Sequence, residues 1–434
     1  MIIKRDRYLN KLIERKENGM VKVITGIRRC GKSFLLNNIY KEYLLSIGIK
    51  TEQIIQLALD QDRNIKYRNP IILGQYIRSL ASKVKGICYV FLDEIQKVAE
   101  IKNPYLDSEN ERITFVDTLL GLMAEKNIDL YVTGSNSKML SSDIITTFRD
   151  RGDEIRLYPL SYSEFYSTYS LTNNRHAWRD YLTYGGMPFI LSRKNHEDKS
   201  KYLLDLFKKT YITDIVERHN ISNDIEVIDD LLNYSASSVG SLTNPTKLEN
   251  TFKSEKKISI SHATISNYLD YFEDAYLIKK AYRYNIKGRK YIGSPLKYYY
   301  TDLGLRNARL NFRQLEENHI MENIIYNELI MRGFNVDVGS IEDFERDENG
   351  KTIRKHLEID FIATNGSNCY YIQSALSLVS EDKKLQETKS LNKIKNSFKK
   401  IIVIKDDIIP WHDNDGILYI GIEQFLLEEN AINL

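Results

Sequence analysis

The chain has 434 residues, a length that corresponds to roughly three domains of about 150 residues each. With 28% charged and 42% hydrophobic residues, it is too apolar for a disordered polymer and is expected to be globular. The net charge of +3, from 62 basic and 59 acidic side chains, excludes a global field that would drive the chain onto nucleic acid or anionic lipid, so any basic surface must be local.

The first part of the chain, residues 1–160, alternates short apolar runs with amphipathic stretches. This pattern is typical of strands separated by helices in a parallel sheet. It predicts an α/β fold with a five-stranded, doubly wound sheet. The predicted strands cover residues 21–25, 54–59, 87–92, 130–133 and 155–157.

The segment GIRRCGKS follows the first predicted strand and precedes an apolar helical run. Its glycines let the backbone turn N–H groups toward phosphates, at the positive end of the next helix. Lys32 would reach the β- and γ-phosphates, and the Ser33 hydroxyl would bind Mg²⁺. The predicted nucleotide-binding residues are Gly26, Ile27, Arg28, Arg29, Cys30, Gly31, Lys32, Ser33 and Phe34.

A carboxylate pair ends the third predicted strand, in Phe91-Leu92-Asp93-Glu94. Such a pair suits a magnesium–nucleotide site, because Asp93 can hold the Mg²⁺ water shell and Glu94 can polarise the attacking water. The alternative is an acidic pair that only caps the next helix. Because the chain also contains the glycine loop, we favour the nucleotide site.

Two further segments carry candidate catalytic groups. The fourth predicted strand ends in Thr133-Gly134-Ser135-Asn136, and Ser135 or Asn136 could orient the water if this strand lies beside the first, although the segment also reads as a plain turn. Ahead of the fifth strand, Arg151, or second Arg149, could be an arginine finger supplied by a neighbouring subunit of a homo-oligomer. The alternative for this Arg-Asp-Arg run is a solvated surface.

The strings GIRRCGKS, FLDEIQK, VTGSNSKML and DRGDEIRLYPLSYSEFY resemble those of the AAA-type ATPases of bacteria and archaea. More specifically, the chain is similar to the group in which a winged helix and a restriction-endonuclease-like domain of unassigned role follow the ATPase core. The resemblance implies ATP and Mg²⁺ as ligands, Asp93 for magnesium and Glu94 as catalytic base. Arg151 stands near the position of the group's Gly-Arg element but precedes its glycine.

The middle part, residues 161–310, is predicted to be a helical lid and winged-helix domain. A helix from Ser261 places apolar side chains on one face and an acidic surface on the other, which suits a phosphate backbone poorly. Residues 279–300 are predicted to form a basic hairpin, called the wing here, that lacks acidic residues. Lys287, Arg289 and Lys290 at its turn are candidates for DNA contact. The alternative is a basic face that docks on an acidic neighbour within the protein.

The last part, residues 311–434, is predicted to be a small α/β domain whose order of elements matches the core of metal-dependent nucleases. Glu358 and Asp360 lie on one predicted strand, and Glu322 on the preceding helix could complete a site. The family pattern places an acid and a lysine on the next strand, where this chain has Gln373 and Ala375. We therefore expect a domain that binds DNA or a subunit without cleaving nucleic acid.

The sequence lacks the patterns of a membrane span, a secretion signal, a disulfide framework and a zinc module. The chain lacks an apolar run near the roughly 18 residues of a membrane span, and its N-terminal segment does not resemble a secretion signal, so we expect a cytoplasmic protein without a membrane partner. The three cysteines are far apart, and the histidines lack metal-ligand spacing, which excludes a disulfide framework or a zinc module.

Three functions remain open from the sequence. The first is an ATP-hydrolysing switch or motor that acts on DNA through the wing. The second is a signalling or remodelling ATPase whose outer domains hold protein partners. The third is an active metal-dependent nuclease, which the missing ligand and lysine disfavour.

Overall fold

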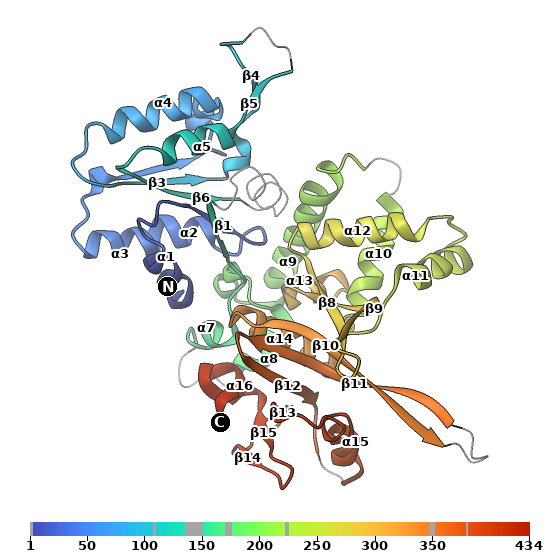
Figure 1. The fold of residues 1–434 in the computed structure, drawn as a ribbon. Coiled ribbons are helices and arrows are strands. Elements are labelled where there is room, and N and C mark those ends of the chain that lie inside the picture. The colour runs from blue at the N-terminus through green and yellow to red at the C-terminus, as the bar shows by residue number, and fades with distance from the viewer. Residues whose placement is uncertain are drawn as a thin grey trace. The chain divides into compact units, whose positions relative to one another are not determined.

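The protein divides into two compact units in a computed structural model that describes residues 3–106, 110–134, 151–169, 176–221, 225–346, 352–378 and 381–434. The first unit comprises Met1–Pro159 with Asp274–Tyr276, and the second comprises Leu160–Glu273 with Leu277–Leu434. In Figure 1 the first unit is coloured from blue to green, and the second from green to red.

A five-stranded parallel sheet forms the centre of the first unit, which confirms the predicted α/β class. Its strand order is β2-β3-β6-β1-β7. The central strands β1, β3 and β6 are buried over most of their length, because their apolar runs lie between two helical layers, whereas only one residue of the edge strand β7 is buried. Their bounds are β1 (Val21–Thr25), β2 (Ile54–Ala58), β3 (Cys88–Asp93), β6 (Ile128–Thr133) and β7 (Gly152–Arg156).

Different helices cover the two faces of this sheet (Figure 1). On one face, α4 (Pro70–Ala81) and α5 (Phe115–Met123) bury aliphatic side chains against the strands. On the other face, the Tyr40 ring contacts the rings of Phe91 and Tyr131, with centroids 5.8 and 5.0 Å apart. Tyr40 belongs to the helix that follows β1, which runs through α2 (Lys32–Phe34), a π-helical turn (Leu35–Tyr40) and α3 (Lys41–Ser46), with α1 (Asp6–Glu14) ahead of β1.

The strand order determines which segments can form a common site. Strand β6 lies between β1 and β3, with Thr133 opposite Ile24 in the register. Because all these strands are parallel, the residues that follow β1, β3 and β6 meet at one edge of the sheet. A short hairpin of β4 (Ile101–Lys102) and β5 (Arg112–Ile113) leaves the unit between β3 and α5.

The second unit begins with helices, as expected for the first part of residues 161–310. A turn at Gly185 and Gly186 interrupts them, and its Gly186 N–H donates to Asp302 Oδ2 at 2.7 Å. Burial raises the pKa of Asp302 to about 6. These helices are α7 (Tyr162–Tyr166), α8 (Ala177–Tyr184), α9 (His196–Tyr211), α10 (Ile225–Ser237), α11 (Pro245–Thr251), α12 (His262–Asp274) and α13 (Leu303–Arg309).

An eight-stranded mixed sheet dominates the rest of the second unit, in the order β14-β15-β13-β12-β11-β10-β8-β9. The predicted wing is its edge hairpin, and β8 pairs in parallel with β10. The strands are β8 (Ile278–Asn285), β9 (Lys290–Tyr300), β10 (Asn335–Arg346), β11 (Thr352–Asn365), β12 (Asn368–Ala375), β13 (Lys399–Ile404), β14 (Trp411–His412) and β15 (Ile417–Gly421). The accompanying helices are α14 (Glu317–Met331), α15 (Glu381–Asn392) and α16 (Ile422–Leu427).

This sheet joins segments that the sequence assigned to different domains. The hairpin of residues 278–300 was expected in a middle domain, yet it shares one hydrogen-bonded sheet with the strands after residue 334. The division into domains of residues 1–160, 161–310 and 311–434 stays a prediction. Among the described residues, no helix is both long and apolar enough to cross a membrane.

Candidate nucleotide site

The glycine loop turns sharply as it leaves β1. Gly26 has φ of 138° and Gly31 has φ of 106°, backbone conformations that side chains rarely adopt. A Cβ on Gly26 would also lie 2.1 Å from the carbonyl oxygen of Leu157. Position 26 therefore requires glycine for its conformation and for space.

The loop brings Lys32 and Ser33 to the carboxyl end of β3. Lys32 is only 4% exposed, and its Nζ donates to the carbonyl oxygens of Gly26 and Ile27 at 2.8 and 3.0 Å. Ser33 Oγ donates to Asp93 Oδ1 at 2.9 Å. The two predicted magnesium ligands, Ser33 and Asp93, are thus in direct contact although they are 60 residues apart in the chain.

Thr133 at the end of β6 holds the carboxylate pair in place. Its Oγ1 donates to Asp93 Oδ1 and accepts the backbone N–H of Glu94 at 3.1 Å. Thr133 is fully buried, and Glu94 has φ of 55°. The sequence analysis placed polar groups after this strand but did not single out Thr133, for which the signal was a hydroxyl as the last residue of an apolar strand.

Glu94 lies in a mixed electrostatic environment. Burial raises the pKa of Glu94, and the neighbouring Asp93 carboxylate acts in the same direction. The cations of Lys32 and Arg28 and the hydrogen bond from Gln96 Nε2 to Glu94 Oε2 oppose this increase in pKa. A carboxylate with a raised pKa, close to a lysine and a magnesium-type ligand set, is suited to accept a proton from water.

The remaining loop side chains divide into core and surface groups. Ile27 and Cys30 are buried, and Cys30 Sγ donates to Leu157 O at 3.5 Å, so only their backbone can contact a ligand. Arg28 is half-buried, while Arg29 and Phe34 are exposed.

The predicted arginine finger lies far from this loop within its own chain. The carbonyl oxygen of Arg151 accepts the N–H of Val21 at 3.0 Å, which places Arg151 at the amino end of β1. The glycine loop follows the carboxyl end of the same five-residue strand, so the exposed Arg151 does not belong to its own chain's site. Ser135, Asn136 and Arg149 lie outside the described residues.

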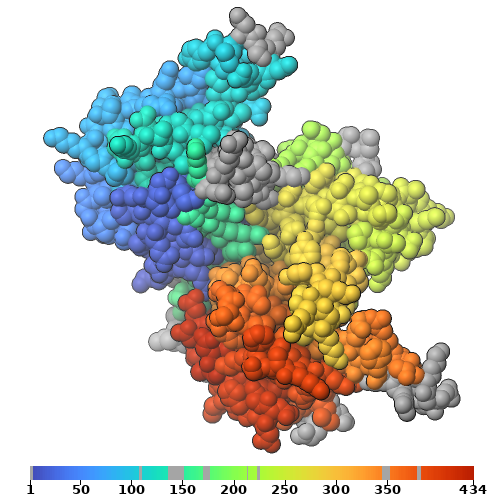
Figure 2. All heavy atoms as spheres, in the orientation of Figure 1, coloured from blue at the N-terminus to red at the C-terminus, as the bar shows by residue number. Residues whose placement is uncertain are grey.

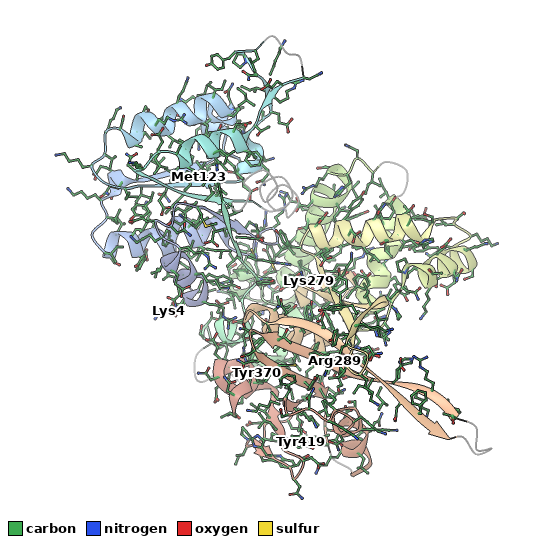
Figure 3. The ribbon with its side chains drawn as sticks, viewed as in Figure 1. Lys4, Met123, Lys279, Arg289, Tyr370 and Tyr419 are labelled. Atoms are coloured by element: carbon green, nitrogen blue, oxygen red, sulfur yellow. The ribbon has the colours of Figure 1, made fainter. Side chains whose placement is uncertain are left out.

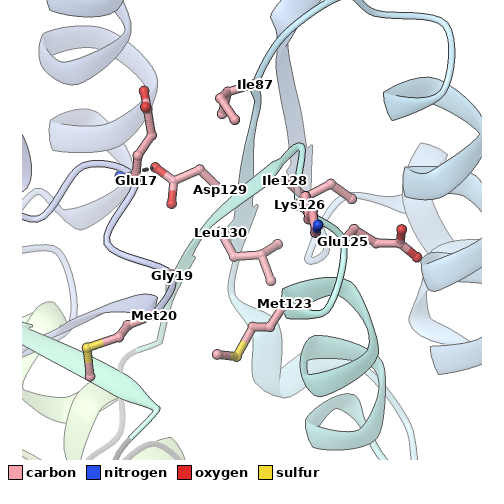
Figure 4. Close-up of a pocket in the computed structure, with 10 residues that line it drawn as sticks. All are labelled: Glu17, Gly19, Met20, Ile87, Met123, Glu125, Lys126, Ile128, Asp129 and Leu130. Atoms are coloured by element: carbon pink, nitrogen blue, oxygen red, sulfur yellow. Dashed lines mark hydrogen bonds between the residues drawn. The ribbon is translucent and has the colours of Figure 1, made fainter.

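A pocket of about 130 Å³ occupies the amino edge of the same sheet (Figure 4). Below it, the buried Lys22 pairs with Asp129, and Asp129 Oδ2 accepts the Tyr131 hydroxyl at 2.7 Å. Gly19 and Met20, which line this pocket, precede β1, whereas the glycine loop follows β1. The pocket and the loop therefore lie at opposite edges of the sheet. We assign the Lys22–Asp129 pair to the packing of the sheet.

Most cations of the wing have partners inside the second unit. The Lys280 ammonium pairs with Asp270 and Glu273 on the acidic face of α12. Lys279 lies 3.7 Å from Glu273, and Arg283 donates to Ser340 Oγ at 3.3 Å. At the base of the hairpin, Lys279 and Lys280 thus face acidic side chains of the same unit, as in the alternative to DNA contact.

The candidate DNA contacts lie at the turn of this hairpin. Lys287, Arg289 and Lys290 are exposed, and Lys287 Nζ donates to the carbonyl oxygen of Glu342 at 3.0 Å. Figure 3 labels Lys279 and Arg289 toward the two ends of the hairpin, and Figure 2 shows part of the hairpin, in yellow to orange, at the surface. Lys287, Arg289 and Lys290 therefore form a short, exposed basic surface at the turn of the hairpin.

The acidic residues predicted near the C-terminus also come together. Glu322, Asp360 and Gln373 line one pocket of about 320 Å³ between α14, the sheet and α15. Ala375, at the place where the family pattern has a lysine, lines the same pocket and is buried.

Two other proteins are similar to this chain over most of its length. An uncharacterized protein of Haemophilus influenzae is 31% identical over 434 residues, which cover 98% of this chain and 99% of that protein. This chain belongs to the same family. An uncharacterized protein of Methanocaldococcus jannaschii is 29% identical over 94% of this chain and 87% of its own length.

Two family profiles match parts of the chain. Residues 18–166 match a family described as "AAA domain", and residues 175–316 match "Domain of unknown function (DUF8612)". The first unit of this family member is therefore an AAA-type P-loop domain. The winged-helix and nuclease-like descriptions of the second unit stay predictions.

Solved structures resemble the chain only distantly. The Aeropyrum pernix ORC1 protein in complex with DNA is 11% identical, over 72% of this chain and 93% of that chain, with a TM-score of 0.31. AMPPCP-bound DnaA from Aquifex aeolicus is 11% identical over 61% of this chain and 85% of that chain, with a TM-score of 0.26.

Proposed function

We propose that this protein binds ATP with Mg²⁺ and hydrolyses it to drive a conformational switch. The observation that carries the proposal is the hydrogen bond between Ser33 and Asp93, with Lys32 and Glu94 beside it at one sheet edge. The match to an AAA domain family supports the same function.

The residues of the loop fit the parts of a magnesium–nucleotide site. Ser33 Oγ and Asp93 would hold the Mg²⁺, which neutralises charge on the phosphates when it is bound. Lys32 would exchange its bonds to loop carbonyls for phosphate oxygens. Glu94 would accept the proton of the attacking water, and Thr133 keeps Asp93 and the Glu94 backbone in position.

Two substitutions test this site in an assay of phosphate release. Lys32→Ala should abolish hydrolysis, because the loop loses its cation, whereas Glu94→Gln should bind ATP and fail to hydrolyse it. Lys83→Ala removes an exposed lysine of the same unit and should leave the rate unchanged. Retained turnover in Lys32→Ala would refute the site.

The partner on which the switch acts is proposed to be DNA, contacted through Lys287, Arg289 and Lys290. Exposed cations that contact phosphates should make binding weaken as salt concentration rises. Duplex DNA should therefore raise the ATPase rate at low salt, and Lys287→Glu/Arg289→Glu/Lys290→Glu should lose that increase while keeping the basal rate. An ATPase that is indifferent to both DNA and salt would exclude this role.

The second candidate is a remodelling ATPase with protein partners. The ion pairs of Lys279 and Lys280 favour it, because they use part of the wing's charge inside the protein. In that case the triple charge reversal would change neither DNA binding nor activity. Arg151 as a finger and Asn136 as a water-orienting residue belong to the proposal for either partner, and a chain fully active as a strict monomer would remove Arg151.

A further inference from the structure

Helix α12 carries its acidic side chains in one half only. They are Asp270, Glu273 and Asp274, which all lie in the second half of the helix. The first half, residues 262–269, contains no Asp, Glu, Lys or Arg in its sequence. The acidic surface that the sequence indicated for this helix therefore belongs to its second half.

Two lysines at the base of the wing pair with this acidic half. The Lys280 ammonium pairs with Asp270 and lies 3.7 Å from Glu273 Oε2, and Lys279 Nζ lies 3.7 Å from Glu273 Oε1. A cation next to a carboxylate reduces the repulsion that the carboxylate exerts on a nearby phosphate. Two of the three acids of α12 are thus compensated within the second unit.

The first half of α12 exposes small and neutral polar side chains. Ile265 and Leu269 are buried and form its core side. Ala263 and Asn267 are exposed, and Ser266 is half-buried. Because Ala263 and Asn267 are four residues apart, they lie one turn apart on the same face of the helix. Among the described residues, none forms a hydrogen bond with the side-chain amide of Asn267, which is therefore free to bind a ligand.

Two exposed lysines precede this helix. Lys253 lies in the π-helical turn (Phe252–Lys256) that continues α11, and Lys257 follows that turn. Neither forms an ion pair within the part of the chain that the structure describes. His262 Nδ1, in the first turn of α12, lies 3.4 Å from Glu249 Oε2 of α11, so the end of α11 adjoins the first half of α12. Lys253 and Lys257 therefore offer uncompensated positive charge beside the neutral half of the helix.

We propose that the first half of α12 reads base edges in the major groove of duplex DNA, with Asn267 on a base and with Lys253 and Lys257 on the adjacent phosphates. The major groove admits an α-helix, and an asparagine amide can form a bidentate pair with adenine N6 and N7. Lysines on phosphates fix the register of the helix without reading sequence. This inference rests on the proposed DNA role of the wing and adds a sequence preference to it.

A selection from randomised DNA duplexes tests the base-reading role. The full chain is offered duplexes with a randomised centre, and the bound sequences are determined after several rounds. The matched control for Asn267→Ala is Asn233→Ala, which removes an exposed asparagine of α10 in the same unit. We expect wild type and Asn233→Ala to enrich one motif with adenine at a fixed position. Asn267→Ala should lose the preference at that position and keep the rest of the motif.

Binding titrations on the selected duplex separate base reading from phosphate contact. Asn267→Ala should bind this duplex about tenfold more weakly than wild type, and the two should bind equally to a duplex in which that adenine is replaced. Lys253→Ala/Lys257→Ala should weaken binding to both duplexes alike and reduce the slope of log K against log salt concentration by about 2. Lys208→Ala/Lys209→Ala removes the same charge from exposed positions of α9 and should change neither quantity.

The outcomes separate this inference from the proposed DNA role. Salt-dependent binding that selects no motif, or the same motif in wild type and Asn267→Ala, would overturn the inference and leave the DNA role of the wing intact. Binding that is lost in Lys287→Glu/Arg289→Glu/Lys290→Glu but unchanged in Lys253→Ala/Lys257→Ala would also overturn it, because the wing alone would then hold the DNA. A wild type that binds no duplex would overturn both and favour a protein partner.

Discussion

The residues of the nucleotide loop act through contacts that cross long stretches of sequence. Asp93 receives hydrogen bonds from Ser33, in the first turn of α2, and from Thr133, at the end of β6. Glu94 is fixed through its backbone by Thr133 and through its side chain by Gln96. Each of these polar contacts therefore affects either the carboxylate proposed to bind Mg²⁺ or the proposed base.

The raised pKa of Glu94 predicts an unusual pH dependence of hydrolysis. A general base acts only when deprotonated, so the rate should fall as the pH drops through a value above the ordinary range of glutamate. Gln96 donates to Glu94 and lowers its pKa, so Gln96→Ala should move this acidic limb to higher pH. The measurement is kcat between pH 5 and 8 under saturating ATP.

The control for this pH profile is a change that leaves the Glu94 environment untouched. Lys83→Ala should reproduce the wild-type profile, because Lys83 is an exposed residue outside the loop. A Gln96→Ala profile that coincides with wild type, or that moves to lower pH, would contradict the assignment of Glu94 as the base.

Among the elements, the wing hairpin depends on its pairing with an acidic helix. Lys280 is mostly buried between Asp270 and Glu273 of α12, whereas Lys290 on the other strand is exposed. Lys280→Met should lower the free energy of unfolding by about 1 kcal/mol, because Asp270 loses its cation and Glu273 keeps only Lys279. Lys290→Met should change it by less than about 0.5 kcal/mol.

Chemical denaturation of the two variants measures this difference. The two variants carry the same substitution in the same hairpin, and they differ in that only Lys280 contacts α12. Equal midpoints for Lys280→Met and Lys290→Met would mean that the contact with α12 contributes nothing to stability.

The sequence predicted elements well where their signal is local. The apolar runs at 21–25 and 88–92 are strands in the structure, and the helix after Ser261 buries Ile265, Leu269 and Phe272 as its periodicity indicates. The strand at 417–421 was not predicted, although its residues are fully buried.

Pairings between distant segments were beyond the sequence. The wing joins β10 through a parallel ladder, and Lys297 meets Glu322 from 25 residues away. Hydrophobic periodicity carries no information on which strand pairs with which. The glycine loop and Asp93 were predicted as one site from their motifs. Thr133, Gln96 and Lys297 belong to no such motif, so their contacts became visible only when the fold was known.

For the whole molecule, the division into two compact units predicts two unfolding steps. A ligand that binds only the first unit stabilises that unit by about 2.7 kcal/mol at a concentration of 100 times its Kd. In calorimetry of Glu94→Gln with Mg²⁺ and ATP, one transition should rise by several degrees and the other should stay constant. Lys32→Ala in the same buffer is the control without nucleotide binding.

Equal shifts of both transitions would contradict this prediction, because they would show that ATP stabilises both units. A single transition that rises with ATP would have the same meaning, because the ligand would then stabilise the entire chain.

The carbonyl oxygen of Leu157 links the nucleotide loop to the chain's crossing between units. It lies in van der Waals contact with Gly26 and accepts the Cys30 thiol, and the second unit begins only three residues later, at Leu160. Three residues span at most about 10 Å, and Pro159 among them stiffens the backbone. The loop and the carbonyl of Leu157 thus pack directly on each other at the end of the first unit.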